Sequence, residues 1–425
     1  MAAAEATDRN RTPFLLAFAT LLTAAAFLFN PADEILRGSL TILTSPANLI
    51  TDYFALANPG AALLNAGVMS YLAILVIHLS RVRVTGPLVA AVFTMAGFSL
   101  FGKNLLNSIP IMAGVYLYAL VSRTPFDRYL LQALFGTALG PLFSEIAFHL
   151  GLAQPLGLLL GFAASLFAGF VLTPLSMHML RFHQGFNLYN IGFTAGIIGM
   201  FFIAVLRNFG IEIGLVNQVS SAGNLPYILL LGILFLGMLV AGLCFSGWRL
   251  TGYGSLLRQS GRLAADFVTI SGFGLTLVNM AVLGILSTGY VLLVGGRLSG
   301  PVIGGIFTVV GFGAFGKHPR NVWPILFGVF LMGLVNHYEI HSTVMLLAAL
   351  FGTTLAPISG HYGPFVGILA GMLHTAMVMN IGDLHAGMNL YNNGFSGGFI
   401  AAAMVPILDG LKEILAHRKK GKPET

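Results

Sequence analysis

The sequence contains the stretch Gly185-Phe186-Asn187-Leu188-Tyr189-Asn190-Ile191-Gly192-Phe193 and, 202 positions later, Gly387-Met388-Asn389-Leu390-Tyr391-Asn392-Asn393-Gly394-Phe395. Both copies lie between long apolar runs, where amides and a phenol are costly unless their polar groups are used. Glycines frame each copy and allow the backbone angles at which a helix ends or restarts. We therefore expect two discontinuous membrane segments that face each other in a pseudo-symmetric transporter or channel.

The composition identifies the class of protein. Of the 425 residues, 56% are hydrophobic and 8% are charged, whereas soluble proteins carry about 25% charged residues. Water-soluble folding would expose too much apolar surface. The composition therefore predicts an all-α polytopic membrane protein that lies in the lipid bilayer. The 53 glycines and 18 prolines predict helices that are kinked, closely packed or broken.

Basic residues are placed as in a membrane protein rather than in a nucleic-acid-binding protein. The net charge is +7, but the basic residues occur in short loops and in a tail at 417–422. Cytoplasmic loops and tails of membrane proteins carry such an excess. We expect a bacterial inner-membrane protein with a cytoplasmic C-terminus and no nucleic-acid partner.

The chain is a tandem duplication. At a spacing of 214, Asp52 matches Asp266, Asn65 matches Asn279, and Phe101-Gly102-Lys103 matches Phe315-Gly316-Lys317. The block 134–137 then matches 350–353 at a spacing of 216. The register changes only between blocks, as insertions in loops require. This pattern predicts a polar N-terminal tail at 1–12, repeat 1 at 13–207, a linker at 208–225, repeat 2 at 226–411 and a basic tail at 412–425.

Each repeat is expected to combine full and broken membrane helices. In repeat 1 we expect helices near 14–30, 60–80, 86–102, 105–122, 154–180 and 193–208. The segment 35–53 is too polar to span the bilayer simply and reads as amphipathic or re-entrant, and the segment 128–150 is interrupted. Several runs are shorter than the roughly 20 residues that cross the bilayer. We expect ten to fourteen membrane or re-entrant segments and prefer inverted repeats, the arrangement common in permeases with broken helices.

The paired phrases are the first candidate site. In this interpretation Asn187, Tyr189 and Asn190, with Asn389, Tyr391 and Asn392, line a substrate pathway. Their amides and free backbone groups would replace water around a neutral solute or a poorly hydrated ion. The alternative is that the amides join helices, which is typically worth about 0.6 kcal/mol.

Three further matched pairs are polar. Asp52 and Asp266 are expected to cap half-helices or to face the pore, and Asn65 and Asn279 follow them on the pathway. Lys103 and Lys317 follow Phe-Gly at a helix end, and we expect their side chains to reach the membrane interface; the alternative is that they line a vestibule.

The carboxyl of Glu145 is a candidate for proton coupling. At the local spacing of 216 its counterpart is His361. A carboxyl within a membrane segment is a functional candidate, and histidine titrates near neutral pH. An acid and an imidazole in matched positions can carry protons, although both can equally lie at a water-filled end.

The sequence supports a metal site or an enzymatic function less well than a transport function. His374, Asp383 and His385 are conceivable metal ligands, but their spacing is not a recognised ligand pattern, so we predict no bound metal and no other cofactor. The sequence has no His-Glu-x-x-His, Gly-x-Ser-x-Gly or phosphate-binding glycine loop, and we predict no catalytic residues.

The arrangement resembles an uncharacterised family of bacterial multi-pass membrane proteins, a domain of unknown function that extends over nearly the whole chain. Each half also resembles the repeat of the urea transporters. Thr51-Asp52-Tyr53-Phe54 followed by Asn58-Pro59-Gly60-Ala61-Ala62-Leu63 is similar to the end of their pore helix and the Asn-Pro-Leu-x-Gly-Leu motif. Tyr189-Asn190 and Tyr391-Asn392 match the Tyr-Asn of their Gly-Leu-x-Gly-Tyr-Asn segment.

The second resemblance implies a channel-like permease with inverted repeats, a trimeric assembly and a narrow pore at the pseudo-twofold axis. This sequence departs from the urea transporters in its longer halves and in Ser271-Gly272-Phe273-Gly274, where Asn-Pro is expected. The Glu145 and His361 pair has no place in that scheme.

The sequence thus predicts a membrane permease, channel-like or proton-coupled, for a small polar solute such as urea. The main alternative is a histidine-dependent cation or metal carrier. A membrane scaffold or an intramembrane enzyme is the alternative from another class.

Overall fold

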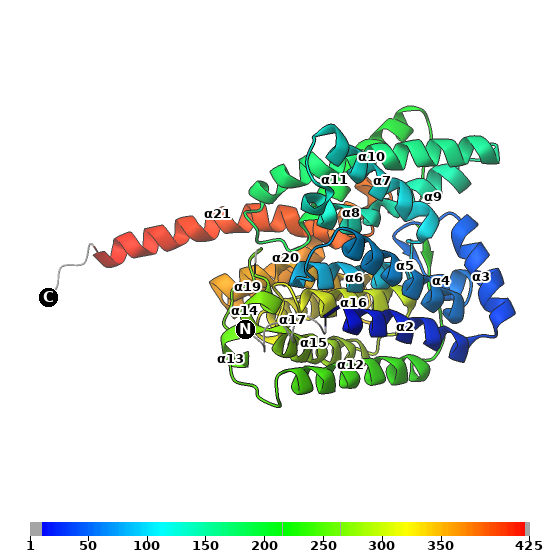
Figure 1. Cartoon of the computed structure of the whole chain (residues 1–425). Coiled ribbons are helices and arrows are strands. Elements are labelled where there is room, and N and C mark those ends of the chain that lie inside the picture. Colours follow the sequence, from blue (N-terminus) through cyan, green and yellow to red (C-terminus); the bar gives the residue numbers. More distant parts are fainter. Residues whose placement is uncertain (1–10, 215, 264, 421–425) are drawn as a thin grey trace.

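The computed structural model describes residues 11–214, 216–263 and 265–420. The predicted tail at 1–12 lies outside these residues, except for Arg11 and Thr12, which begin helix α2. Residues 421–425 of the predicted basic tail also lie outside. The described chain is almost entirely helical (Figure 1).

The first half contains helices that follow the expected order. They are α2 (Arg11–Phe29), α3 (Ala32–Thr44), α4 (Tyr53–Leu56), α5 (Pro59–Leu79), α6 (Gly86–Phe98), α7 (Leu105–Val121), α8 (Leu130–Gly136), α9 (Gly140–Phe148), α10 (Gln154–Phe182) and α11 (Asn190–Asn208), with 3-10 turns at Phe126–Tyr129 and Thr137–Leu139.

The second half repeats most of this series. Its helices are α12 (Leu225–Phe245), α13 (Tyr253–Leu256), α14 (Phe267–Ser271), α15 (Phe273–Leu293), α16 (Gly300–Phe312), α17 (Pro319–Val335), α18 (Thr343–Gly352), α19 (Ala356–Tyr362), α20 (Pro364–Ile381) and α21 (Asn392–Lys420), with 3-10 turns at Thr353–Leu355 and Gly382–Leu384. The predicted boundary at 412 falls inside α21, which extends beyond the rest of the molecule in Figure 1.

Local sequence explains where these helices begin. The side chain of Asn58 accepts the amide of Ala61 at 2.8 Å, and Pro59 occupies the first turn of α5. Asn104 and Asn107 exchange side-chain and backbone bonds at the start of α7, and His318 and Asn321 do the same for α17. Polar caps and early prolines satisfy or remove the free N–H groups of a first turn.

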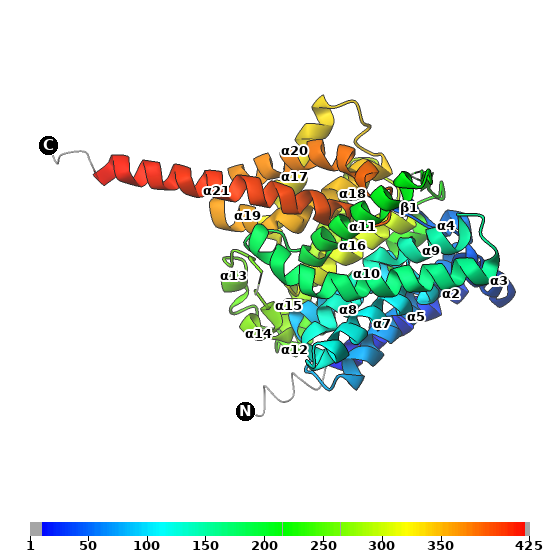
Figure 2. The same ribbon diagram turned by 90° about the horizontal axis from the view of Figure 1, so that it is seen from above.

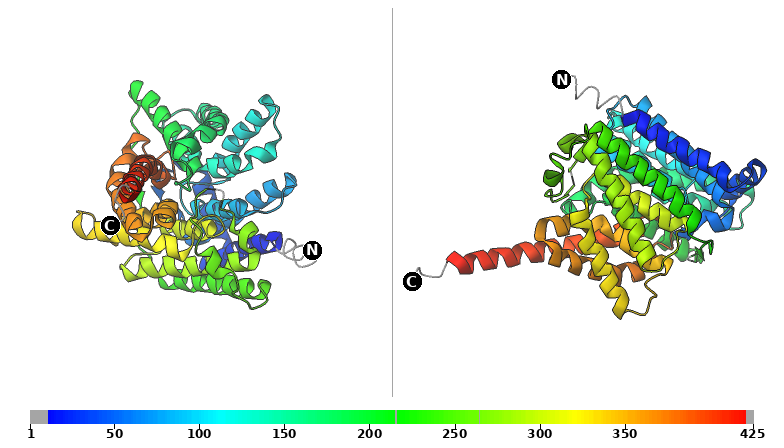
Figure 3. Two further views of the ribbon diagram at one scale, coloured as in Figure 1. Left: turned by 90° about the vertical axis from the view of Figure 1, so that its left-hand side faces the viewer. Right: turned by 90° about the horizontal axis from the view of Figure 1, so that it is seen from below.

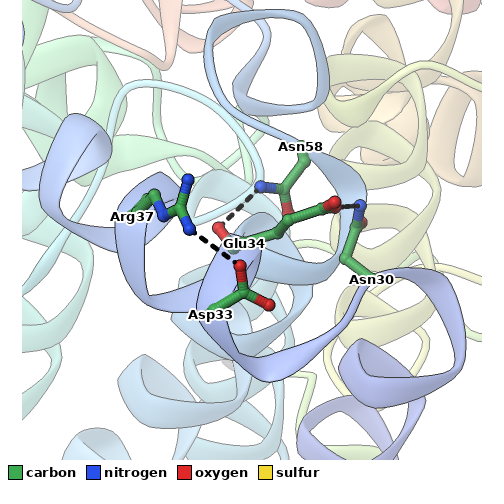
Figure 4. Close-up of polar contacts among 5 residues, drawn as sticks. All are labelled: Asn30, Asp33, Glu34, Arg37 and Asn58. Atoms are coloured by element: carbon green, nitrogen blue, oxygen red, sulfur yellow. Dashed lines mark hydrogen bonds and ion pairs between the residues drawn. The ribbon is translucent and has the colours of Figure 1, made fainter.

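The segment expected to be amphipathic forms α3, which is tied to the start of α5 (Figure 4). Asn30 donates to the carboxylate of Glu34 at 2.8 Å, and Arg37 pairs with Asp33 at 2.9 Å. Asn58, which caps α5, donates its amide to the carbonyl of Glu34 at 3.0 Å. One face of α3 is thus held against the protein through Ile35 and Ile42, which are buried.

The short helices α6 and α16 lie in the centre of the molecule (Figure 1), and Figure 2 shows α16 there from above. All residues of α16 are buried, as are all but Pro87 of α6. They touch through glycine: a Cβ added to Gly97 would lie 2.6 Å from the carbonyl oxygen of Gly304. One added to Gly311 would lie 3.1 Å from that of Ala90. The end of each helix therefore meets the start of the other, so they run antiparallel.

The outer helices α2 and α12 are also antiparallel. Phe29, at the end of α2, stacks on Tyr227 near the start of α12, with ring centroids 5.5 Å apart. At the other end, Phe14 of α2 packs on Phe273, which in turn stacks on Phe245 at the end of α12. The view from below in Figure 3 shows these two helices on the same face of the molecule.

A two-residue parallel pairing joins the first half to the linker. Strands β1 (Ile50–Thr51) and β2 (Asn217–Gln218) align Ile50 with Asn217. The amide of Asp52 continues the pairing by donating to the carbonyl of Gln218 at 2.9 Å. The linker residues Asn217 and Gln218 thus lie beside the segment that ends at Asp52.

The protein is a membrane protein by the length and apolar character of its helices. Among the described residues, nine helical segments are long and apolar enough to cross a bilayer, and four shorter apolar helices, α6, α7, α16 and α17, accompany them. Two of the nine segments are broken, at Thr137–Leu139 and Thr353–Leu355. A glycine precedes each break and Pro141 or Pro357 follows it, and proline cannot donate the hydrogen bond that would continue the helix.

Candidate functional site at the centre of the molecule

The structure brings the two Asn-Leu-Tyr-Asn phrases together. The ring centroids of Tyr189 and Tyr391 are 4.9 Å apart, and both side chains are buried. Gly185 and Gly387 have φ of +79° and +74°, which residues with a side chain rarely adopt. The left-handed glycine lets each phrase turn inward before helix α11 or α21 begins.

Each phrase is fixed to the opposite half by backbone bonds. The amide of Leu188 donates to the carbonyl of Thr354, in the break between α18 and α19. The amide of Leu390 donates to the carbonyl of Ala138, in the break between α8 and α9. The broken helices therefore supply carbonyl groups that accept hydrogen bonds from the backbone amides of the two Asn-Leu-Tyr-Asn segments.

The amides of Asn187 and Asn389 are fully buried and bonded to protein. Asn187 donates to the carbonyl of Gly394 at 2.9 Å, and Asn389 donates to that of Gly192 at 2.9 Å. Their oxygens accept the amides of Tyr189 and Tyr391, at 3.3 and 3.0 Å. In this conformation both amides join the halves and orient the tyrosines.

Asn190 and Asn392 each pair with a histidine. Asn190 Oδ1 lies 2.9 Å from His183 Nε2, and Asn392 Oδ1 lies 3.0 Å from His385 Nε2. The pairing of each histidine with an asparagine was not predicted. Their equal separation of seven residues was the available signal.

The largest difference from expectation concerns Lys103 and Lys317. Both side chains are fully buried, so the prediction that they reach the membrane interface is wrong. Each follows a left-handed glycine, Gly102 or Gly316, at the end of a central helix, and that turn directs the chain inward. In the sequence, this site is indicated by a lysine that follows a short apolar helix at the matched position of each half.

The two lysines differ in their partners. Lys317 Nζ donates to the hydroxyl of Tyr189 and, at 2.6 Å, to Thr353 Oγ1. It also lies 4.5 Å from the centroid of the Tyr189 ring. Among the described residues Lys103 Nζ has no hydrogen-bond partner, and it lies 5.1 Å from the centroid of Phe98. Phe98 packs edge-on against Tyr391, with centroids 4.5 Å apart.

Asn65 and Asn279 hold the backbone of these lysines. Asn65 Nδ2 donates to the carbonyls of Ser99 and Lys103 at 2.7 and 2.8 Å. Asn279 Nδ2 makes the matching bonds to Gly313 and Lys317, again at 2.7 and 2.8 Å. The predicted pathway asparagines therefore stabilise the inward turns that position the lysines.

Asp52 and Asp266 each cap helices from both halves. Asp52 Oδ1 accepts the amides of Phe54 at 2.9 Å and Gly300 at 3.2 Å, at the starts of α4 and α16. Asp266 Oδ1 accepts those of Val268 and Gly86, both at 3.0 Å, at the starts of α14 and α6. This is the capping role that the sequence left open beside a pore-facing one.

Burial raises the pKa of the Asp52 carboxyl to about 6, against the amides of Ser220, Phe54 and Gly300, which lower it. Asp52 lies outside the candidate membrane spans. Its charge therefore changes in mildly acidic conditions.

A cavity of about 670 Å³ leads to the tyrosine pair. Arg128 and Arg262 are its charged lining residues, and both are exposed. Tyr189, Tyr391 and the rings of Phe135, Phe312 and Phe315 line it as well. The cavity thus has basic residues in its wall and aromatic residues next to the buried lysines.

Glu145 and His361 are not brought together. Glu145 is buried in α9, and its Oε2 lies 3.0 Å from Nδ1 of His149, whose side chain is 41% exposed. His361 is exposed in α19 and packs on Phe186 and Tyr362. Figures 1 and 2 show α9 and α19 at opposite ends of the molecule. A direct proton transfer between these two groups is excluded in this conformation.

The conceivable metal ligands are separated by other partners. His374 Nε2 lies 2.9 Å from Asn393 Oδ1, and its Nδ1 lies 3.3 Å from Ser396 Oγ. His385 pairs with Asn392, and Asp383 is exposed. Within the ranges that the structure describes, no group of three His, Cys, Asp or Glu residues is placed to hold a metal ion.

Comparison with known families agrees with a protein made of two halves. The sequence model of DUF1576, described as a protein of unknown function, matches residues 31–208 and 246–410. The chain belongs to this family. No curated protein and no solved structure matches the chain, so its likeness to the urea transporters rests on the motifs alone.

Proposed function

We propose that this DUF1576 protein is a permease that moves a small polar solute along the contact between its two halves. The observation that carries the proposal is the tyrosine pair, which lies between two buried lysines and next to a cavity lined by both halves. Polar and ionisable side chains within a membrane protein are expensive and mark solute pathways. Discontinuous helices that meet near the middle of the protein are the usual frame of such a site.

The proposed architecture is a pair of inverted repeats. The antiparallel packing of α6 with α16, and of α2 with α12, supports a pseudo-twofold axis perpendicular to these helices. The exchanged caps of Asp52 and Asp266 support the same symmetry. The permease would lie in the bacterial inner membrane with its C-terminus in the cytoplasm, and a trimer is the assembly that the urea-transporter likeness suggests.

Reconstitution tests the proposal directly. Purified protein is placed in liposomes, and the flux of urea, glycerol, potassium and small anions is compared with that of protein-free liposomes. The proposal expects faster passage of at least one solute. Protein that is folded and inserted but speeds none of them would favour a scaffold or an intramembrane enzyme.

A further inference from the structure

The two central lysines bring hydrogen-bond donors to the centre of the protein. A protonated lysine carries three N–H groups and no acceptor. Lys317 uses two of them on Tyr189 and Thr353, whereas Lys103 uses none. A solute that binds at Lys103 must therefore supply acceptors for its N–H groups.

No carboxylate pairs with either of these two lysines among the described residues. Rings of Phe98, Phe312 and Tyr189 surround the ammonium groups instead. A buried ion without an opposite charge costs several kcal/mol, and aromatic faces offset only part of that cost. An anion would supply both the missing charge and the missing acceptors.

The charged residues that line the cavity leading to the tyrosine pair are also basic. The cavity that reaches Tyr189 and Tyr391 is lined by Arg128 and Arg262 and by no acidic residue. Neither arginine forms an ion pair with a carboxylate in the described ranges. A cleft lined by one sign of charge concentrates the opposite ion.

We propose that the solute is a small anion, such as a monovalent inorganic ion or a short carboxylate, which enters by this cavity and binds in turn at Lys317 and Lys103 on either side of the tyrosine pair. This inference rests on the permease function proposed above and specifies its substrate class. The matched lysines give one binding position to each half, and weak multiple sites allow an ion to leave as well as enter.

The test uses liposomes loaded with potassium nitrate, potassium formate or potassium chloride, with valinomycin to balance charge, and a parallel set loaded with urea. We expect anion release well above that of protein-free liposomes. The double variant Lys103→Met/Lys317→Met should lower the apparent affinity or the flux at least about thirtyfold, as expected for loss of a buried charged partner. Lys412→Met, which changes a lysine on α21 over the ring of Tyr362, should leave the flux unchanged.

The outcomes separate the two proposals. Flux of urea without flux of anions would overturn the anion inference and leave the permease function standing. Absence of all flux would overturn both. Anion flux that is unchanged in the lysine double variant would also overturn the inference.

A binding measurement covers the case in which the variant does not fold. The melting temperature of wild-type protein in detergent is compared in sodium nitrate, sodium formate and sodium gluconate at equal ionic strength. A ligand that binds the native state stabilises it, so nitrate or formate should raise the melting temperature above its value in gluconate. Equal melting temperatures in the three salts would contradict the proposal.

Discussion

The side chain of Asn187 uses both of its polar ends within the protein, and Asn389 repeats the arrangement. Replacing both by alanine removes these buried hydrogen bonds, each of which is typically worth about 0.5–1.5 kcal/mol. We therefore expect Asn187→Ala/Asn389→Ala to melt at a lower temperature and, because the tyrosines lose their orientation, to lose flux.

The matched control is Asn380→Ala. Asn380 is exposed and bonds only to the carbonyl of Ala376 in its own helix, so its loss should change neither property. Flux that survives the double substitution would show that the two amides join helices without shaping the pathway.

From the raised pKa of the Asp52 carboxyl we expect the stability of the protein to depend on pH. Its folded pKa of about 6 lies above the ordinary value of 3.8, so the folded state binds a proton that the unfolded chain releases. The free energy of unfolding should therefore fall by up to about 3 kcal/mol as pH rises from about 4 to about 6, and no further above that.

Unfolding in detergent across pH 4–7 measures this effect as the difference between wild type and Asp52→Asn. The variant should lack the decrease attributable to this group, because its amide does not titrate. Parallel curves for the two proteins would contradict the prediction.

Glu145 belongs to a different polar group from the central lysines. Its buried carboxylate contacts the half-exposed His149, which lines a second cavity together with Glu212. Because glutamine cannot exchange a proton, we expect Glu145→Gln to remove any dependence of flux on a pH gradient. Glu212→Gln, an exposed carboxyl in the same cavity, is the control. A dependence that is equal in wild type and in Glu145→Gln would count against proton coupling through this residue.

Among the elements, the contact of α6 with α16 tolerates no added side chain. A Cβ at position 97 would lie 2.6 Å from the carbonyl oxygen of Gly304 and 3.1 Å from its Cα. We expect Gly97→Ala to lower the free energy of unfolding by about 1–3 kcal/mol, the usual cost of overpacking. Gly289→Ala in α15, where a Cβ would meet nothing within 4 Å, should be neutral or slightly stabilising. Equal melting temperatures for the two variants would show that the central helices can separate at no cost.

Helices were the most predictable elements because their signals are local. The expected helices at 60–80, 105–122 and 154–180 correspond to Pro59–Leu79, Leu105–Val121 and Gln154–Phe182. Proline, asparagine caps and apolar length mark these boundaries in the sequence. The interruption expected in 128–150 appears as the 3-10 turn Thr137–Leu139.

The partners of the candidate site were not predictable in the same way. The bond between Asn187 and Gly394 joins residues 207 positions apart, and no local pattern encodes it. Lys103 was misjudged because a lysine at a helix end usually extends to the interface. Its burial depends on the turn at Gly102 and on packing from the opposite half, where Leu390 lies against that glycine.

For the molecule as a whole, the direction in which each half inserts distinguishes inverted from parallel repeats. Helices α5 and α15 end at Leu79 and Leu293, which are matched residues with exposed side chains. If the repeats are inverted, these two helix ends lie on opposite sides of the membrane. A duplication with parallel insertion would place them on the same side.

Single cysteines distinguish the two arrangements. The exposed Cys244 is first replaced by serine, and Leu79→Cys or Leu293→Cys is then labelled in intact cells or sealed vesicles with a membrane-impermeant maleimide. Inverted repeats predict that one cysteine reacts only from the outside and the other only from the inside, while both react in detergent. Labelling of both from one side would remove the pseudo-twofold axis that relates Lys103 to Lys317, and with it the equivalence of the two binding positions on which passage between the halves depends.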